Sequence, residues 1–447
     1  MVDLKAEARQ LLDRTLEEVD VRLAVARNLK IEGSHLHAAG GSFNLKELRK
    51  VLIIAIGKAA TPMYEAAIGA LGALPRNLAA IVVSPQPPRK QHGTLLFFHG
   101  SHPAPDESSR TAATSILKLL GTADTDTLVL FLISGGSSSM VELPLDPDIP
   151  NTDIAEFNRV LVGSGMAISE INVLRKHLSA VKGGRLAAAA SPAAQCSLIV
   201  SDVPAGSLDM VGSGPSIPDS SSRELCGEIY RRLRSTHVLP RSVERFFDRG
   251  LPSDPVKPGD PCFRHAVWVS ILSSDDLART AAAIASRAGF HVEHDDTCDG
   301  WSSANAARYL LDRSKRLHMR SGRTCLISVG EVSVALNASS GNAFSDQNSS
   351  GQGGRNQHFV LQCAIDLSGC DLATSVLSAG SDGIDGNSPA AGAIADPGTC
   401  DRALAHGIDP LEVLASFDSF RLFHALGDAI VIGPTGNNLR DLRLLIE

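Results

Sequence analysis

Short runs of apolar residues alternate with longer amphipathic segments along most of the chain. The runs are continuous and rich in Val, Ile and Leu, which is typical of strands covered on both faces of a parallel sheet. Strands are predicted at 51–56, 78–83, 95–98, 128–133, 198–200, 267–272, 324–329 and 375–378. Helices are predicted between them at 59–71, 107–120, 153–164, 167–180, 274–288, 302–317 and 356–367. This alternation predicts an α/β fold with mainly parallel sheets.

Two proline-rich stretches, 212–219 and 251–261, indicate where the chain divides. The second has the composition of a linker or rigid connector. We therefore expect one domain at 1–250 and another at 251–447. Between the two stretches lies a helical piece whose arginines are expected to form a solvated hinge face. They are Arg231, Arg232, Arg234 and Arg241. The segment 337–354, rich in Ser, Asn and Gly, is expected to be a mobile loop.

Composition narrows the class of protein. The chain has 447 residues, with 42 Lys and Arg against 49 Asp and Glu, so it lacks the basic footprint of a nucleic-acid-binding protein. Its apolar runs are far shorter than the ~20 residues of a membrane span, and the N-terminus has no apolar signal core. The eight cysteines include no Cys-x-x-Cys pair, so we expect a reduced, cytoplasmic chain without nucleic-acid or membrane partners.

Glycine-rich and serine-rich turns follow two of the predicted strands, where ligands bind in open α/β sheets. Gly57 and Lys58 follow the run 51–56, and Lys58 opens a helix. A lysine there is electrostatically unfavourable unless an anion offsets it, so Lys58 is predicted to meet a phosphate. The run 128–133 leads into Ser134, Gly135, Gly136, Ser137 and Ser138. Their backbone N–H groups and hydroxyls predict a cradle for a phosphate or carboxylate.

Carboxylates follow two other strands. Asp202 comes after the run 198–200, and Asp382 and Asp385 come after the run 375–378. Carboxylates at strand ends hold Mg²⁺ or accept a proton from a hydroxyl. For Asp202 and Asp382, helix capping is an equal alternative, and which of them is base and which is metal ligand stays open. Asp385 precedes a glycine and also fits a simple turn.

Further polar groups complete the candidates. Arg355 follows the glycine-rich stretch 351–354 and offers a planar donor fork for phosphate or carboxylate. The stretch 175–185 contains Lys176, Lys182 and Arg185, which suit either a charged helix face or a small anionic ligand. The stretch 433–438 is a polar strand-end turn. The histidines His35, His37, His99, His102, His291 and His294 are interpreted as structural or loop residues.

Known nucleotide-binding fingerprints are missing. The chain has neither a Walker A pattern nor a Gly-x-Gly-x-x-Gly pattern, which disfavours a nicotinamide-dinucleotide site.

The motifs, taken in order, resemble those of the glycerate 2-kinase family, the MOFRL-type glycerate kinases, whose members also carry the name hydroxypyruvate reductase. The matching stretches are 56–60, 102–107, 132–136, 171–187, 201–203, 213–215, 353–357, 378–386 and 433–442. Four features depart from the family pattern. The stretch 203–207 replaces the usual Val-x-Gly-Asp, the loop 337–354 is longer than usual, and two single positions differ. Ser137 stands where a third glycine is usual, and Val332 stands where threonine is usual. These departures bear on substrate preference more than on fold.

The resemblance implies a larger Rossmann-like N-terminal domain, a smaller C-terminal domain and an active site in the cleft between them. It implies ATP-dependent phosphorylation of D-glycerate to 2-phospho-D-glycerate with Mg²⁺, and it places the family's characteristic lysine and arginine on Lys58 and Arg355. Asn356, Asp385 and Asn437 fall in motifs of the implied binding site. The alternatives are an NAD(P)H-dependent hydroxypyruvate reductase and a non-catalytic protein that binds sugar acids or nucleotides. The oligomeric state stays open, a homodimer included.

Overall fold

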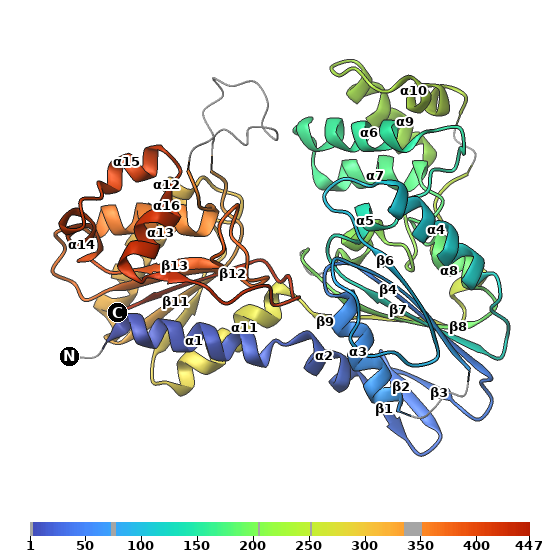
Figure 1. The fold of residues 1–447 in the computed structure, drawn as a ribbon, viewed down its shortest axis with the longest axis horizontal. Helices are drawn as coiled ribbons and strands as arrows, with labels where there is room; N and C mark the ends of the chain where they lie inside the picture. Colours follow the sequence, from blue (N-terminus) through green and yellow to red (C-terminus); the bar gives the residue numbers. More distant parts are fainter. Residues whose placement is uncertain (1–2, 73–76, 204–205, 251–252, 335–350) are drawn as a thin grey trace. The chain divides into compact units, whose positions relative to one another are not determined.

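The computed structural model describes residues 3–72, 77–203, 206–250, 253–334 and 351–447. The chain divides into two compact units (Figure 1). The N-terminal unit is Val21–Leu272, and the C-terminal unit joins Met1–Asp20 to Ser273–Glu447. Most of the predicted segment 337–354 lies outside the described residues.

The division found in the structure differs from the predicted boundary at residue 250. The strand β9 (Ala266–Leu272) pairs in parallel with β8 (Ala194–Val200) and so completes the sheet of the N-terminal unit. The preceding proline-rich stretch also bonds within this unit, because the N–H of Val256 donates to the carbonyl of Gly183. At the start of the chain, helix α1 (Leu4–Glu18) packs on α11 (Ser274–Arg287) of the C-terminal unit.

The sheet of the N-terminal unit has six parallel strands in the order β6-β5-β4-β7-β8-β9. Its other strands are β4 (Lys50–Ile56), β5 (Leu78–Ser84), β6 (Thr94–His99) and β7 (Thr127–Ile133). The chain runs from β4 outward to β5 and β6, then returns to β7 on the other side of β4. The strand order therefore reverses between β4 and β7, which is where ligands bind in doubly wound folds.

Short elements surround this sheet. The helices are α2 (Val21–Asn28), α3 (Ala60–Leu71), α4 (Glu107–Leu120), α5 (Ser137–Met140) and α8 (Arg185–Ala190), with 3-10 turns at Leu208–Ser213 and Pro261–Phe263. A separate antiparallel sheet contains β1 (Leu29–Glu32), β2 (His35–Ala38) and β3 (Gly41–Asn44). His35 and His37 lie exposed on β2, as expected for surface histidines.

Four helices of the N-terminal unit share a hydrophobic core of their own. They are α6 (Asn151–Gly163), α7 (Ile168–Leu178), α9 (Arg223–Arg234) and α10 (Arg241–Asp248). Phe157, Leu174, Tyr230 and Phe247 are buried between them. The segment predicted as a hinge face is thus part of a packed helical layer. Its arginines do face solvent, where Arg232 pairs with Glu170 and Arg234 with Asp248.

The sheet of the C-terminal unit has six strands in the order β10-β11-β15-β12-β13-β14. They are β10 (His291–His294), β11 (Thr324–Gly330), β12 (Ser375–Gly380), β13 (Gly392–Ala395), β14 (Ala429–Ile430) and β15 (Asp441–Ile446). Only β10 and β11 pair in parallel, so the expectation of mainly parallel strands fails for this sheet. β15 inserts antiparallel between β11 and β12, and β13 pairs antiparallel with both β12 and β14.

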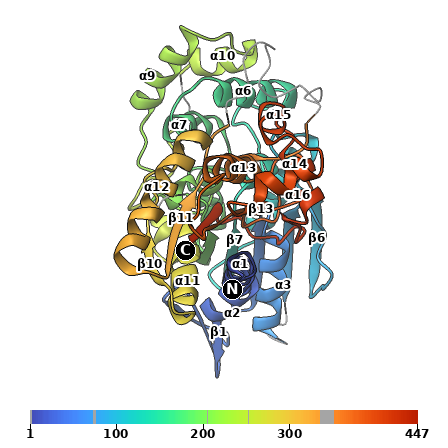
Figure 2. The ribbon, with the colours of Figure 1, turned by 90° about the vertical axis from the view of Figure 1, so that its left-hand side faces the viewer.

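Helices cover both faces of this second sheet (Figures 1 and 2). One face carries α12 (Ser303–Ser321) and α13 (Arg355–Leu367), and the other carries α1 and α11. The remaining helices, α14 (Thr399–Ala405), α15 (Pro410–Ala415) and α16 (Ser419–Leu426), pack around α13. Phe359, Leu361 and Leu445 are fully buried in the core between α13 and the sheet.

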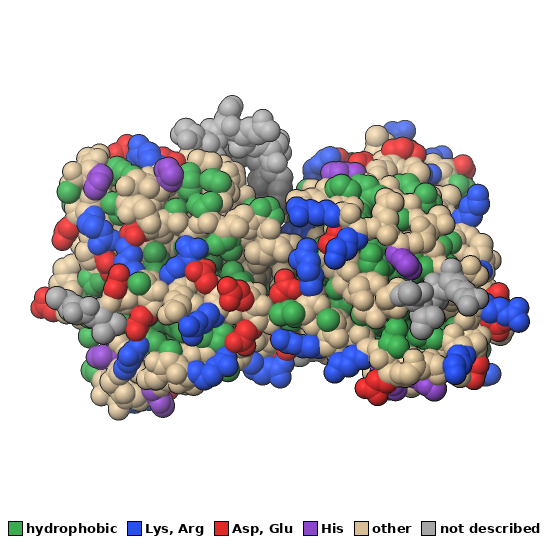
Figure 3. Space-filling view, turned by 60° about the horizontal axis from the view of Figure 1, so that its bottom comes forward, with side chains coloured by type: hydrophobic (Ala, Val, Ile, Leu, Met, Phe, Trp, Pro, Cys, Tyr) green, Lys and Arg blue, Asp and Glu red, His purple; other side chains and the backbone are tan. Residues whose placement is uncertain are grey.

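Charged side chains of both signs are interspersed over the face of each unit seen in Figure 3. All eight cysteines lie among the described residues, and none forms a disulfide. Across the described part of the chain, every helix is too short or too polar to cross a membrane.

Candidate functional site

Two of the predicted turns lie side by side at the strand-order reversal of the N-terminal unit. Lys58 follows β4, Ser134 follows β7, and these strands are neighbours. The N–H of Ser134 donates to the carbonyl of Ile56 (3.0 Å), and the N–H of Lys58 donates to that of Gly135 (2.9 Å). The Oγ of Ser134 accepts from the N–H of Ala59 (3.0 Å). These bonds hold the lysine turn and the serine-glycine turn together as one surface.

Two glycines are required by this close packing. Gly57 has φ +123°, and a Cβ added there would lie 2.3 Å from Ser134 Oγ. Gly136 has φ +83°, and a Cβ added there would lie 3.3 Å from Lys58 Cγ and 3.2 Å from His102 Cδ2. A side chain at Gly57 would clash with Ser134, and one at Gly136 would be strained by the positive φ and would crowd Lys58 and His102. The lysine side chain and the histidine ring therefore converge on the Gly136 turn.

His102 is a candidate that the sequence reasoning missed, since it was interpreted as a loop residue. Desolvation of the ring, together with the positive charge of Lys58, lowers the pKa of His102. The imidazole is therefore uncharged near neutral pH and able both to donate and to accept a hydrogen bond. The one available signal was its place in the family-like stretch 102–107.

The serines that follow Gly136 extend the polar surface. Ser137 is 4% exposed, and its Oγ has no hydrogen-bond partner among the described residues. Ser138 Oγ lies 3.3 Å from Ser213 Oγ, which in turn donates to Asn172 Oδ1 (2.9 Å). A buried hydroxyl without a partner is uncommon in folded proteins and calls for a water or a ligand. Ser137 is thus the member of the predicted cradle with unused hydrogen-bonding capacity.

The residues of the predicted basic cluster form contacts within the N-terminal unit. Lys176 is buried and pairs with Asp209 (2.7 Å) and with Asp219. Lys182 is 1% exposed and pairs with Glu142. Arg185 donates to the carbonyl of Asp254 (3.3 Å) and to Ser253.

These contacts differ from the predicted ones with an anionic ligand. Burial lowers the pKa of Lys182, and the Glu142 carboxylate opposes that shift. The charges of Lys176 and Lys182 are already compensated by carboxylates within the unit, and Arg185 bonds to a backbone carbonyl and a serine, so the structure gives all three residues structural partners.

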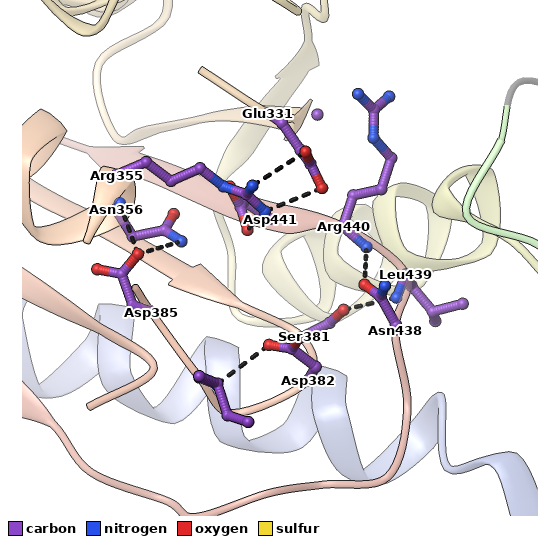
Figure 4. A network of polar contacts seen from close by, with 12 residues as sticks. Glu331, Arg355, Asn356, Ser381, Asp382, Asp385, Asn438, Leu439, Arg440 and Asp441 are labelled. Atoms are coloured by element: carbon purple, nitrogen blue, oxygen red, sulfur yellow. Dashed lines mark hydrogen bonds and ion pairs between the residues drawn. The ribbon is translucent and has the colours of Figure 1, made fainter. Parts of the chain in front are cut away.

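Three strand ends of the C-terminal unit meet at one edge of its sheet. Gly330 at the end of β11, Gly380 at the end of β12 and Asp441 at the start of β15 are in register. Arg355, the first residue of α13, reaches this edge (Figure 4). Its Nε and Nη2 donate to the two carboxylate oxygens of Asp441 (2.6 and 3.0 Å). Its Nη1 donates to Glu331 (3.0 Å).

The two carboxylates differ in exposure. The Asp441 side chain is 2% exposed, whereas those of Arg355 and Glu331 are 38% and 40% exposed. Burial alone would lower the pKa of Arg355, but hydrogen bonding and charge from Asp441 raise it. Burial raises the pKa of Glu331, and Arg355 opposes that shift. Asp441 is therefore the buried support of the guanidinium, and Glu331 is its more exposed partner.

Sequence reasoning missed Glu331 and Asp441 as functional candidates. Asp441 lies in the family-like stretch 433–442, and Glu331 precedes one of the departures from the family pattern. Both residues could therefore have been identified from the motifs. Their contact with Arg355 could not, because it joins residues 86 and 24 positions apart.

Asp385 holds the start of α13. It is 2% exposed, and its two oxygens accept from the backbone N–H groups of Asn356 (3.0 Å) and Gln357 (2.9 Å). The side-chain amides of the same two residues also donate to it. Burial raises the pKa of Asp385 to about 6. Asp385 and Asn356 therefore fix the helix end from which Arg355 projects.

Three further predicted residues, Asp202, Asp382 and Asn437, are divided between the two units. Asp382 accepts from the N–H of Ile384 (3.1 Å) in the turn after β12 (Figure 4). Asn437 is 5% exposed and donates to the carbonyl of Val19 (2.8 Å), which ties the end of α1 to its unit. Asp202 follows β8 in the N-terminal unit and is partly buried. Within the described ranges, no three His, Cys, Asp or Glu side chains gather as metal ligands.

Comparisons with known proteins agree with this architecture. The model of a domain of unknown function (DUF4147) matches residues 7–248, and that of the MOFRL family matches 324–441. The chain is 32% identical to the D-glycerate 2-kinase of Thermotoga maritima over 402 residues, covering 88% of this chain and 90% of the relative. It is also 32% identical over 453 residues to an Agrobacterium vitis protein provisionally named hydroxypyruvate reductase, covering 100% and 95%.

Solved structures give the same result. A crystal structure of the Thermotoga maritima glycerate kinase superposes with a TM-score of 0.81 at 30% identity, covering 99% of both chains. A Pyrococcus horikoshii protein gives a TM-score of 0.79 at 28% identity, covering 100% of this chain and 99% of that one. The resemblance drawn from the motifs is thereby confirmed, and the chain belongs to the glycerate 2-kinase family.

Proposed function

We propose that this protein transfers a phosphoryl group from ATP to the 2-hydroxyl of D-glycerate, giving 2-phospho-D-glycerate. The observation that carries the proposal is the convergence of Lys58, His102 and the Ser134–Gly136 turn at the strand-order reversal of the N-terminal sheet. Two of these features were selected from the sequence as anion-binding groups. The glycerate kinases of Thermotoga maritima and Homo sapiens among the relatives support the same reaction.

In-line phosphoryl transfer requires positioning and charge neutralisation more than covalent chemistry. Lys58 neutralises the oxygens of the transferring group, and the N–H and hydroxyl groups of Ser134–Ser138 hold a phosphate or the glycerate carboxylate. Arg355, oriented by Asp441, binds a second anionic group in exchange for Glu331. Bound Mg²⁺ would supply further charge neutralisation, since it is commonly held by one or two carboxylates plus substrate phosphates. Asp202 and Asp382 are the carboxylates proposed for that role and for accepting the hydroxyl proton.

Phosphorus NMR of the purified protein with D-glycerate, ATP and Mg²⁺ tests the proposal. We expect a 2-phosphoglycerate signal whose rate of appearance falls at least ~100-fold in Lys58→Ala and Arg355→Ala. The thermal unfolding midpoint of Lys58→Ala should remain close to that of the parent protein. That of Arg355→Ala should fall, because the buried Asp441 carboxylate loses its counter-ion, so this variant is assayed at a temperature where circular dichroism shows it folded. Lys50→Ala, at the opposite end of β4, and Arg421→Ala, whose exposed side chain pairs with Asp418, are the matched controls.

The other outcomes are distinct. Absence of any phosphoglycerate contradicts the assignment to D-glycerate. ADP formation with another hydroxy acid indicates a kinase of changed substrate. NADH oxidation by hydroxypyruvate without ATP indicates the reductase for which the Agrobacterium vitis relative is named. Thermal stabilisation by ligands without turnover indicates a binding protein.

A further inference from the structure

A cavity of about 220 Å³ opens beside Arg355 in the C-terminal unit. We call it the α13 cavity and define it by Arg355, His358, Asn387, Phe417 and Ser419. Its volume is below the ~300–1,000 Å³ of pockets that enclose a whole drug-sized ligand. It therefore has room for one ring system of a larger molecule.

Aromatic rings form one wall of the α13 cavity. The rings of His358 and Phe417 are stacked, with centroids 5.3 Å apart and planes inclined by 19°. Burial lowers the pKa of His358, so the imidazole is neutral near neutral pH. Its Nδ1 is buried without a hydrogen-bond partner among the described residues. Phe417 has φ +56°, a strained conformation for a phenylalanine and one that is found preferentially at functional sites.

Backbone held in place by hydrogen bonds forms another wall. A Cβ added at Gly351 would lie 2.3 Å from the carbonyl oxygen of Ser416, and one at Gly353 would lie 2.5 Å from Ser419 Oγ. The Asn387 side chain accepts from the N–H of Gly353 (2.8 Å) and donates to the carbonyl of Gly351 (3.2 Å). The glycine stretch is thus pressed against the turn that precedes α16, and the cavity wall is preorganised.

The charge distribution indicates the class of ligand. Arg355 is the charged residue in the lining described for the cavity. The N-terminus of α13 is already occupied by the Asp385 carboxylate, so Arg355 is left as the group that recognises an anion there. A ligand that fits has a planar, largely apolar ring and an anionic end. Nucleotides combine these two features, because a base stacks on aromatic side chains while its phosphates pair with arginine.

We propose that the α13 cavity binds the purine ring of the phosphoryl donor, with the ring against Phe417 and His358 and the phosphates toward Arg355. This inference rests on the proposed function, because it takes ATP as the donor. It adds a base-binding site that the strand-end motifs do not include.

Calorimetric titration with ATP in the absence of glycerate tests the cavity without turnover. We expect Phe417→Leu and His358→Gln each to weaken ATP binding at least ~10-fold, since base–aromatic stacking contributes about 1–3 kcal/mol. Inorganic tripolyphosphate, which lacks the base, should bind all variants equally. Phe420→Leu is the matched control, because Phe420 and His424 form a similar stacked pair (5.1 Å, 19°) outside the cavity lining.

Several outcomes overturn the assignment. These are unchanged ATP affinity in both variants, an equal loss for ATP and tripolyphosphate, and no ATP binding by the parent protein. Thermal unfolding of each variant shows whether it folds. If Phe417→Leu does not fold, the ATP affinity of His358→Gln tests the cavity. Base-dependent ATP binding without phosphoglycerate formation would contradict the proposed function alone. Phosphoglycerate formation with unchanged affinity in the variants would contradict the cavity alone.

Discussion

At the scale of single residues, burial separates lysines that look alike in the sequence. Lys58 is partly exposed beside a glycine-rich turn, whereas Lys176 and Lys182 are buried against carboxylates. The partner of Lys182, Glu142, lies 40 positions away, so no local pattern reveals the pair. Sequence reasoning identified all three as candidates for an anion site. Only the tertiary structure shows that two of them already have internal counter-ions.

The buried pair gives a test of this structural role. We expect Lys182→Met to lower the free energy of unfolding by about 3–5 kcal/mol, because Glu142 is left as an uncompensated buried charge. The double variant Lys182→Met with Glu142→Leu should recover most of that loss. Urea unfolding measures both, with the exposed Lys90→Met as control. Loss of glycerate phosphorylation in a Lys182→Met protein of unchanged stability would instead show that Lys182 contacts a ligand.

At the scale of elements, α13 shows how one helix end supports the site. The sequence predicts the helix at 356–367, and the structure has it at Arg355–Leu367. Its first N–H groups are satisfied by Asp385, which follows β12 rather than preceding the helix. A capping residue is normally sought just before the first turn, so this cap was not predictable from the sequence. It holds the helix end at which Arg355 meets Asp441 and Glu331.

The Asp385 cap of α13 should make the stability of the C-terminal unit depend on pH. Because burial raises the pKa of Asp385 to about 6, the folded protein binds a proton there more tightly than the unfolded chain does. The contribution of Asp385 to the free energy of unfolding is therefore fully present below about pH 4 and is lost as the pH rises through about 6. The free energy of unfolding falls by up to about 3 kcal/mol over this range.

Urea unfolding from pH 4 to 7 measures this change, followed by the fluorescence of Trp301 in proteins that carry Trp268→Phe, so that only this unit is seen. We expect Asp385→Asn to lack this part of the pH dependence. Asp409→Asn, which alters the ordinary cap of α15, should retain it. Parallel curves for the parent protein and Asp385→Asn would contradict the assignment.

At the scale of the whole molecule, the first helix of the chain belongs to the C-terminal unit. Helix α1 packs on α11 and on the sheet of the C-terminal unit, with Ala8, Leu11 and Leu12 buried. Ion pairs from Glu7 to Arg323 and from Glu18 to Arg287 reinforce the contact. The predicted boundary at residue 250 did not include helix α1 in the C-terminal unit. Proline content indicates where the chain is irregular, but it carries no information on which distant segment a helix packs against.

Removal of residues 1–20 should therefore destabilise the C-terminal unit alone. Each buried leucine contributes about 1.5–3 kcal/mol, so we expect a loss of several kcal/mol. The two tryptophans report the units separately, since Trp268 lies on β9 and Trp301 lies in the C-terminal unit. In single-tryptophan proteins, the denaturant midpoint seen by Trp301 should fall and that seen by Trp268 should not. A shift in the Trp268 transition would contradict this division of the chain.

The sequence by itself determined the positions of most elements. Continuous apolar runs mark the strands, and amphipathic segments mark the helices, because neighbouring residues set both periodicities. The two anion-binding candidates, Lys58 and Arg355, were also found from local chemistry, namely a cation at the start of a helix after a glycine turn. The motifs then indicated the family that the comparisons confirm.

Only the tertiary structure decided which strands are neighbours and which charges meet. The strand β15, whose apolar run is interrupted by Arg443, pairs antiparallel with both β11 and β12 and brings Asp441 to Arg355. Likewise, β4 and β7 become neighbours although 70 residues lie between Ile56 and Thr127. These pairings are set by register and by burial of surfaces from distant segments, so a local pattern of hydrophobic residues does not contain them.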